Sequence, residues 1–198
     1  MLFDPLQLAG AALVRLDRHE DERGFFARTV CAEEFRAHGL PGTFVQSSIS
    51  WNRRRGTLRG LHFQWPPSHE GKLVRCVRGA IYDVLLDLRP AQPTYLLHQA
   101  VALDEDNRDA VFVPSGVAHG FQTLADDTEV LYQMADTHAP ALAGGVRWND
   151  AAFGISWPLS GDIVIAERDA TWPDFERRDF EAELTRRKVA GGAEASWT

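Results

Sequence analysis

Short apolar stretches that alternate with polar positions dominate the middle of the chain, from about residue 43 to residue 135. Within residues 80–89, Tyr82 and Val84 begin an apolar face that continues at every second residue, and Asp83 and Asp87 fall on the other face. Glycine and proline residues separate these stretches at intervals typical of turns. The pattern predicts strands at residues 43–50, 57–64, 72–79, 80–89, 98–104, 110–114 and 128–134.

Helical periodicity is confined to two short stretches, residues 32–39 and 180–188. Many short strands with few helices predict an all-β fold, built as a sandwich or a jelly-roll barrel. The 198 residues fit a single domain, which we place at residues 1–188. Residues 189–198 are rich in glycine, alanine and serine, so we expect a flexible tail there.

The overall charge and the apolar pattern exclude several classes of protein. A net charge of −7 argues against nucleic acid as a partner. No apolar run approaches the length of a membrane span, and the N-terminus lacks the basic region of a secretory signal. We therefore expect no membrane partner and a cytoplasmic location. The two cysteines, Cys31 and Cys76, are expected to be buried free thiols rather than a disulfide.

Positive charge is concentrated in residues 53–78, in spite of the acidic net charge. Seven Arg and Lys residues stand there with a single acid, Glu70. Such a cluster suits an anion site, and a diphosphate in particular, but it is equally typical of a solvated positive face. Charge alone leaves both interpretations open.

Two motifs carry candidate chemistry, RGLHFQ at residues 59–64 and PSGVAHGF at residues 114–121. The second contains the pattern P-x-G-x-x-H, which resembles the second signature of the cupin jelly-roll barrels. Metal-binding cupins carry H-x-H in their first signature, where this chain has His62 followed by Phe63 and Gln64. A carboxamide is a poor substitute for imidazole as a transition-metal ligand, so we expect no metal. His62 would then be free to act as a base, although a single barrel histidine more often has a structural role.

Other residues near His62 in the predicted fold favour the catalytic interpretation. Lys72 begins the next strand, where a hairpin could bring its ammonium close enough to stabilise an enolate oxygen. Tyr132 alternates with apolar residues and could face the barrel interior as an acid, or serve only as a core aromatic. Asp169 could orient His62, or be a surface acid. The same orienting role could belong to Asp83 beside His119.

The relative position of Arg59 and His62 is a geometric difficulty. Strict alternation along residues 57–64 places these two side chains on opposite faces of the strand. Both can reach one pocket only if the strand bulges or twists sharply near Gly60. We therefore predict an irregularity at that glycine.

Taken together, the motifs resemble those of the dTDP-4-dehydrorhamnose 3,5-epimerases. The resemblance runs in consistent order from about Leu16 to Phe175. It is carried by DERGFF (21–26), GTLRGLHFQ (56–64), KLVR (72–75), YDVLLDLRP (82–90), PTY (93–95), VPSGVAHGF (113–121), EVLYQ (129–133) and GVRWND (145–150). It implies a cupin-type jelly-roll barrel with short peripheral helices, particularly near the C-terminus.

The resemblance also implies an isomerase of deoxysugar biosynthesis, which epimerises C3 and C5 of a nucleotide-linked 4-keto-6-deoxyhexose. His62, oriented by Asp169, would remove each proton, Lys72 would stabilise the enolate, and Tyr132 would return a proton to the opposite face. No cofactor is implied, because the ketone itself acidifies the neighbouring carbons. The family forms homodimers with exchanged N-terminal strands. The implied substrate-binding residues are Arg23 (contributed to the partner's site, at the nucleotide), Phe26, Gln46, Arg59 (at the diphosphate), His119 and His138.

Four positions depart from the pattern of the family and leave the substrate open: His138, Arg28, Ser48, and His69 on the loop between His62 and Lys72. His138 stands where many relatives have tyrosine, Arg28 where glutamate is frequent, and Ser48 where asparagine is common. The exact sugar and the nucleobase are therefore undetermined, as is the choice between one carbon and two. The alternatives are a single-carbon epimerase, a metal-dependent cupin oxygenase, and a sugar-nucleotide binding protein without catalysis.

Overall fold

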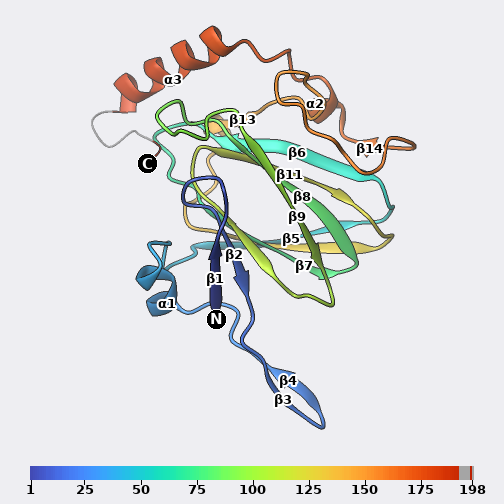
Figure 1. Cartoon of the computed structure of the whole chain (residues 1–198). Helices are drawn as coiled ribbons and strands as arrows, with labels where there is room; N and C mark the ends of the chain where they lie inside the picture. The colour runs from blue at the N-terminus through green and yellow to red at the C-terminus, as the bar shows by residue number, and fades with distance from the viewer. Residues whose placement is uncertain (192–196, 198) are drawn as a thin grey trace.

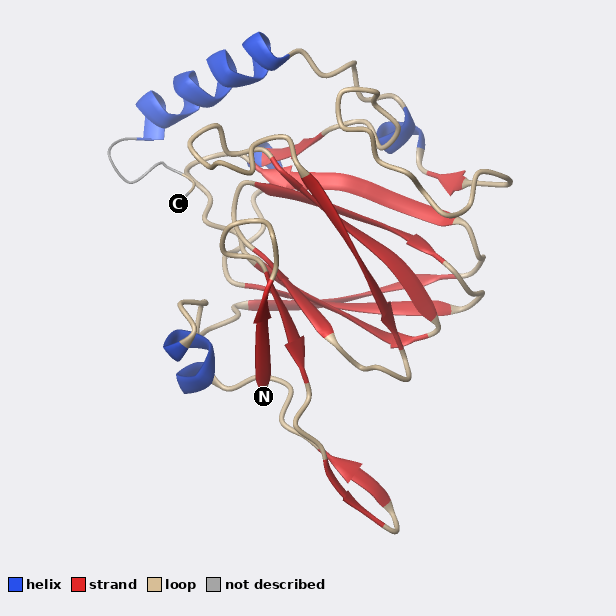
Figure 2. Cartoon of the chain, viewed as in Figure 1, coloured by secondary structure: helices blue, strands red, loops and turns tan. Residues whose placement is uncertain are grey.

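Two β-sheets face each other in the computed structural model, which describes residues 1–191 and Trp197 (Figures 1 and 2). The first sheet has the strand order β1 (Leu2–Pro5), β2 (Ala12–Arg15), β10 (Ala110–Val113), β7 (Lys72–Arg78), β12 (Thr128–Met134) and β5 (Gln46–Asn52). The second has the order β13 (Ala143–Gly145), β6 (Thr57–Gln64), β11 (Val117–Thr123), β8 (Ala80–Asp87) and β9 (His98–Asp104). The short strand β14 (Val164–Ile165) pairs with β6 in parallel, whereas the other pairs are antiparallel. The prediction of an all-β fold is confirmed.

Every strand predicted from the pattern is present, with ends shifted by up to three residues. The structure adds β1, β2, β11 and the hairpin of β3 (His19–Asp21) and β4 (Gly24–Phe26). Every residue of β11 is buried and every residue of β3 and β4 is exposed. A strand with the same environment on both faces shows no alternation, which is why β3, β4 and β11 lacked the signal of a half-buried strand.

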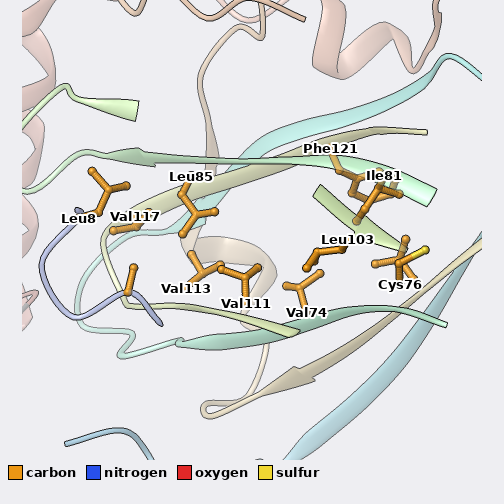
Figure 3. Packing of buried hydrophobic residues seen from close by; sticks show 12 residues of the cluster. Leu8, Val74, Cys76, Ile81, Leu85, Leu103, Val111, Val113, Val117 and Phe121 are labelled. Carbon is orange, nitrogen blue, oxygen red and sulfur yellow. The ribbon is translucent and has the colours of Figure 1, made fainter. Parts of the chain in front are cut away.

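The principal core fills the space between the two sheets. Figure 3 shows side chains from both sheets meeting there, among them Val74 of β7, Leu85 of β8 and Phe121 of β11. The aspartates of β8, Asp83 and Asp87, are also fully buried, because the face opposite Tyr82 and Val84 points into this interior. Burial of both faces of β8 therefore places carboxylates inside the barrel, where each needs a partner.

Two further apolar clusters cover the outer faces of the sheets. Helix α3 (Arg177–Gly191) packs Phe180 and Leu184 against residues of β6 and β8, with α2 (Glu167–Ala170) beside β6 (Figure 1). Helix α1 (Ala32–Ala37) covers the first sheet, and a 3₁₀ turn, η1 (Pro140–Leu142), precedes β13. Both predicted helices are present. The segment predicted as a tail mostly lies outside the described residues, although α3 continues to Gly191 and Trp197 is buried.

The structure also bears on the expectations for cysteines and membranes. Cys31 and Cys76 are both free thiols, of which Cys76 is buried and Cys31 is half-buried. Among residues 1–191 and Trp197, no helix is long and apolar enough to span a membrane.

Candidate active site

A cavity of about 360 Å³ opens between the two sheets. Strand β6 of the second sheet lines one side, and β5, β7 and β12 of the first sheet line the opposite side. Six residues that the sequence singled out meet at this cavity: Arg59, His62, Lys72, His119, Tyr132 and His138. The barrel therefore brings together residues that are up to 79 positions apart in the chain, from Arg59 to His138.

His62 forms a close pair with Asp169. The Nε2 atom of His62 lies 2.7 Å from Oδ1 of Asp169, and the backbone N–H of Gly60 donates to Oδ2 at 3.2 Å. Asp169 is buried on α2, which opposes its ionisation, but the hydrogen bond and charge of His62 outweigh that effect and hold the pKa of Asp169 below its usual value. The imidazole is 41% exposed, so one nitrogen is fixed by the carboxylate while the ring faces the cavity.

The predicted irregularity at Gly60 is confirmed. In the pairing of β6 with β11, His62 lies opposite His119 and Arg59 lies opposite Phe121, so β6 has one extra residue in this interval. Gly60 has a φ of 129°, and a Cβ there would lie 2.5 Å from the Cα of Gly120. The shift turns Arg59 to the cavity, where its Nε donates to Oδ1 of Asn52 at 2.8 Å.

Lys72 approaches His62 from the opposite sheet. Its Nζ donates to the carbonyl oxygen of His62 at 3.3 Å and lies 3.2 Å from Oε1 of Glu70. The predicted proximity of Lys72 and His62 is therefore present, but the predicted hairpin is wrong, because β6 and β7 belong to different sheets that face each other. Glu70, which the sequence reasoning counted only as the single acid of a basic segment, also lines the cavity.

A second histidine–carboxylate pair lies deeper in the barrel. Nε2 of His119 is 2.7 Å from Oδ2 of Asp83, and both side chains are almost fully buried. The ring of Tyr132 meets the His119 ring edge-on, with centroids 5.8 Å apart. Desolvation of the hydroxyl, together with the charge of Asp83, raises the pKa of Tyr132 above its usual value. Tyr132 therefore keeps its proton at neutral pH and is able to donate it.

Three residues expected at the substrate do not line this cavity. Gln46 lies next to it, where its Oε1 accepts a hydrogen bond from the backbone N–H of His138 at 2.8 Å. Arg23 and Phe26 belong to the β3–β4 hairpin, which projects away from the barrel (Figure 1). Within one chain, Arg23 pairs with Asp21 and Phe26 is 77% exposed.

The cavity also contains residues that the sequence reasoning did not assign. Arg168 lines it beside the Asp169 helix, and its guanidinium stacks over Trp172 at 5.5 Å. Ser48, noted only as a departure, and Ser50 line it from β5. Alternation would have found Ser50, because it is two residues from Ser48 on the same face of β5. Arg168 had no such signal, since its position depends on how α2 docks onto β6. Arg28 lies elsewhere, paired with Glu34.

A transition metal would lack ligands at the position the cupin pattern suggests. Among the described residues, no group of three or more His, Cys, Asp or Glu side chains is arranged to hold a metal ion. Gln64, which takes the place of the second histidine of H-x-H, uses its amide for protein contacts. Its Nε2 donates to Glu70 at 2.8 Å and its Oε1 accepts from the N–H of Ala139 at 2.8 Å. The donor set therefore suits acid–base chemistry better than metal binding.

Comparison with known proteins gives a consistent result. The sequence profile of the family described as dTDP-4-dehydrorhamnose 3,5-epimerase matches residues 5–177. The chain is 41% identical over 172 residues to an enzyme of that name from Methanothermobacter thermautotrophicus, covering 86% of this chain and 92% of the relative.

Two solved structures show the same cupin-type barrel. The Bacillus anthracis dTDP-4-dehydrorhamnose 3,5-epimerase, with TDP and PPi bound, aligns with a TM-score of 0.84 and 34% identity, covering 88% of this chain and 99% of that one. A 3'-monoepimerase from Streptomyces bikiniensis, in complex with dTDP-quinovose, aligns with a TM-score of 0.80 and 28% identity, over 94% and 99% of the two chains. The expected jelly-roll architecture is thereby confirmed, and the chain belongs to the dTDP-4-dehydrorhamnose 3,5-epimerase family.

Proposed function

We propose that this protein is an isomerase that epimerises C3, C5 or both carbons of a nucleotide-linked 4-keto-6-deoxyhexose, with His62 as the base. The observation that carries the proposal is the His62–Asp169 pair, 2.7 Å apart and open to a cavity that also contains Lys72 and Tyr132. Family membership supports the reaction class and deoxysugar biosynthesis as its setting. The same reaction on dTDP-4-dehydro-6-deoxyglucose would yield dTDP-4-dehydrorhamnose.

The first step is removal of a proton from a carbon next to the ketone. Asp169 holds Nε2 of His62, which leaves Nδ1 as the ring nitrogen that accepts the proton. The electrons of the broken C–H bond form a carbon–carbon double bond to C4, and the negative charge moves to the C4 oxygen. The ammonium of Lys72 stabilises that oxygen, and Asp169 stabilises the imidazolium. The ketone supplies the acidity of the carbon, so we propose that no cofactor or metal takes part.

Inversion requires a new proton from the other face of the sugar ring. His62 lies on the second sheet and Tyr132 on the first, so a ring held between the sheets has a base on one side and an acid on the other. Burial raises the pKa of the Tyr132 hydroxyl, so Tyr132 is protonated when the enolate forms. We assign Tyr132 to C5. After it donates, the tyrosinate regains a proton from solvent, and the His62 imidazolium releases the abstracted proton to solvent, which resets both groups.

Cationic side chains at the cavity favour a diphosphate-bearing substrate. Arg59 and Arg168 both line it, and guanidinium groups bind phosphate oxygens in pairs of hydrogen bonds. We propose Arg59 as the principal diphosphate ligand, with His119 and His138 contacting the sugar. The TDP bound to the Bacillus anthracis relative supports a thymidine nucleotide.

Deuterium incorporation from D₂O tests this function. The wild-type protein and a dTDP-4-keto-6-deoxyhexose are expected to give product labelled at each carbon that is epimerised. Tyr132→Phe is expected to reduce turnover at C5 by about 10²–10⁴-fold while C3 still exchanges. If the wild-type protein labels neither carbon of any such sugar nucleotide, the proposed reaction is wrong.

Action at C3 alone is a second candidate function. The structural relative from Streptomyces bikiniensis is described as a 3'-monoepimerase, which shows that this barrel can serve one carbon. Label at C3 with none at C5 in the wild-type protein would identify this reaction.

We further propose that the protein works as a homodimer in the cytoplasm. The β3–β4 hairpin exposes Phe26 and extends from the barrel, as a segment that exchanges between subunits would. Ile49 and Trp51 are also exposed along β5, at the free edge of the first sheet. In such a dimer Arg23 would reach the nucleotide at the partner's site, near Gln46. Light scattering is expected to give twice the chain mass, and Arg23→Ala is expected to raise KM more than it lowers kcat.

A further inference from the structure

Two charged residues of opposite sign enter the cavity from the same short segment. Glu70 and Lys72 are two positions apart, and both side chains point into the cavity. Nζ of Lys72 lies 3.2 Å from Oε1 of Glu70, and their side chains are only 13% and 5% exposed. Such a buried ion pair is retained only when both charges are well partnered, because each loses most of its hydration.

The second carboxylate oxygen of Glu70 is held by Gln64. Nε2 of Gln64 donates to Oε2 of Glu70 at 2.8 Å, and the other end of the same amide accepts from Ala139 N–H at 2.8 Å. The N–H of Glu70 also donates to Oγ of Ser68 at 3.2 Å. Glu70 is thus fixed at its backbone and at both oxygens, so it cannot turn away from Lys72 without breaking a hydrogen bond.

Lys72 in turn has one direction left for a ligand. An ammonium carries three N–H donors. Two of these point to Oε1 of Glu70 and to the carbonyl oxygen of His62, at 3.2 and 3.3 Å. The remaining donor lies at the cavity, which Lys72 lines.

From this geometry we propose that Glu70 is the positioning residue for Lys72: held by Gln64, it pairs with the ammonium and aims it at the oxygen that becomes negative. The inference rests on the proposed function for the identity of that oxygen, but not for the contact itself. It also gives Gln64 a purpose. Gln64 takes the place of a histidine that binds metal in other cupins. Here its carboxamide holds the Glu70 carboxylate, which in turn holds the Lys72 ammonium.

The electrostatic surroundings of Lys72 show why an acid is needed there. Among the described residues that line the same cavity, Glu70 is the only one with a carboxylate, and the nearby carboxylates of Asp169 and Asp83 are each paired with a histidine; the other ionisable groups carry no carboxylate. They are Arg59 and His62 on β6, His119 on β11, Tyr132 on β12, His138 before η1, and Arg168 on α2. Nearby positive charges favour loss of a proton from an ammonium, whereas an adjacent carboxylate opposes it.

The chain offers a direct spectroscopic test, because Lys72 and Lys188 are its only lysines. In protein labelled with ¹³Cε-lysine, Lys188→Arg assigns the Lys72 signal, whose titration is followed in the wild-type protein and in Glu70→Gln. The titration of Lys72 is expected to move to lower pH in Glu70→Gln, because the variant loses the carboxylate that lies 3.2 Å from Nζ. Lys188, on α3, serves as the internal control and is expected to titrate alike in both proteins.

Kinetics test the positioning role. In Glu70→Gln, kcat is expected to fall about 100-fold with KM changed less than about threefold, because the cation acts on the enolate oxygen rather than on the bound ketone. The alkaline limb of the activity profile should move to lower pH together with the lysine titration. Glu70→Asp retains the charge, so its lysine midpoint should stay nearer that of the wild-type protein. Glu167→Gln, an exposed acid on α2, is the control and should behave as the wild type.

An unchanged Lys72 midpoint in folded Glu70→Gln would overturn the inference. So would wild-type kcat in Glu70→Gln when Lys72→Met is inactive. Failure of the proposed function gives a different result, an inactive wild-type protein in which the lysine titration still responds to Glu70→Gln. Circular dichroism of each variant confirms that it is folded.

Discussion

Two histidine–carboxylate pairs lie side by side in this barrel, yet their surroundings are opposite. His62 and His119 face each other in the pairing of β6 with β11, and each is 2.7 Å from a carboxylate. The His62 side chain is 41% exposed, while that of His119 is 3% exposed. Both histidines line the cavity and the hydrogen bond is the same in both pairs, so the exposed fraction of the ring distinguishes the proposed base from the more enclosed histidine.

The origin of each carboxylate explains the difference. Asp83 lies in β8, the strand next to β11, and its side chain is fully buried. Asp169 comes from α2, a short helix that follows the last strand in the chain and packs against β6. The carboxylate of the His119–Asp83 pair comes from a strand of the barrel. The carboxylate of the more exposed His62–Asp169 pair comes from a helix outside the barrel. The first should therefore matter most to stability and the second to catalysis.

The largest effect is expected from His62→Asn. Loss of a positioned base typically lowers turnover by about 10²–10⁴-fold, and kcat for the epimerised product should fall by that factor. The His62 side chain is partly exposed, but its loss leaves the buried Asp169 without this partner, so the free energy of unfolding should fall by about 1–2 kcal/mol. The exposed His69 lies outside the site cavity, and His69→Asn is the matched control. Equal turnover in the two variants would contradict the assignment.

The enclosed pair should show the reverse behaviour. His119→Asn leaves the buried Asp83 carboxylate without its partner in the interior, and breaking a buried pair in this way typically costs about 3–5 kcal/mol. Urea unfolding measures the loss. A variant as stable as His62→Asn would remove the distinction between the two pairs.

A smaller effect on turnover is expected from Asp169→Asn. The amide keeps the size of the side chain but loses the charge that stabilises the imidazolium, and a misoriented catalytic group costs about 100-fold in rate. KM should remain near the wild-type value. A variant that loses only stability, with kcat intact, would show that Asp169 is merely structural.

The smallest effect is on the pH dependence of stability. The pKa of Asp169 is lowered in the folded protein, because the hydrogen bond and charge of His62 outweigh the effect of burial. Its contribution is therefore fully present above the unfolded-state pKa, near 3.9, and is lost as the pH falls through the lower folded-state value. The stability difference between wild type and Asp169→Asn should shrink over that acidic range. A difference that grows on acidification would have the wrong sign.

The all-β fold was accessible from the sequence because most strands are short stretches rich in β-branched and aromatic residues, separated by glycine and proline. Residues 57–64 and 128–134 coincide with β6 and β12 as predicted. The β3–β4 hairpin gave no alternating pattern, because all of its residues are exposed in the single chain. Apolar and polar residues alternate along a strand only where its two faces lie in different environments, so a strand whose faces are alike gives no such pattern.

The candidate site was partly accessible from the sequence. Lys72 lies near His62 as predicted, although the two residues come from different sheets and not from one hairpin, and alternation placed Tyr132 toward the interior. Arg168 depends on the docking of α2, which no local pattern encodes. The role of Glu70 was overlooked because only its charge within a basic segment was counted. Its position two residues before Lys72, on the same face of an extended segment, could have indicated the contact.

The identity of the base is tested most directly by deuterium wash-in at C3 of a dTDP-4-keto-6-deoxyhexose. This exchange reports proton abstraction itself, before any slower step of turnover. The wild-type protein is expected to exchange the C3 proton, and His62→Asn, folded and still binding TDP, is expected to show no exchange above the rate without enzyme. Exchange by His62→Asn at the wild-type rate would show that another group in the cavity removes the proton.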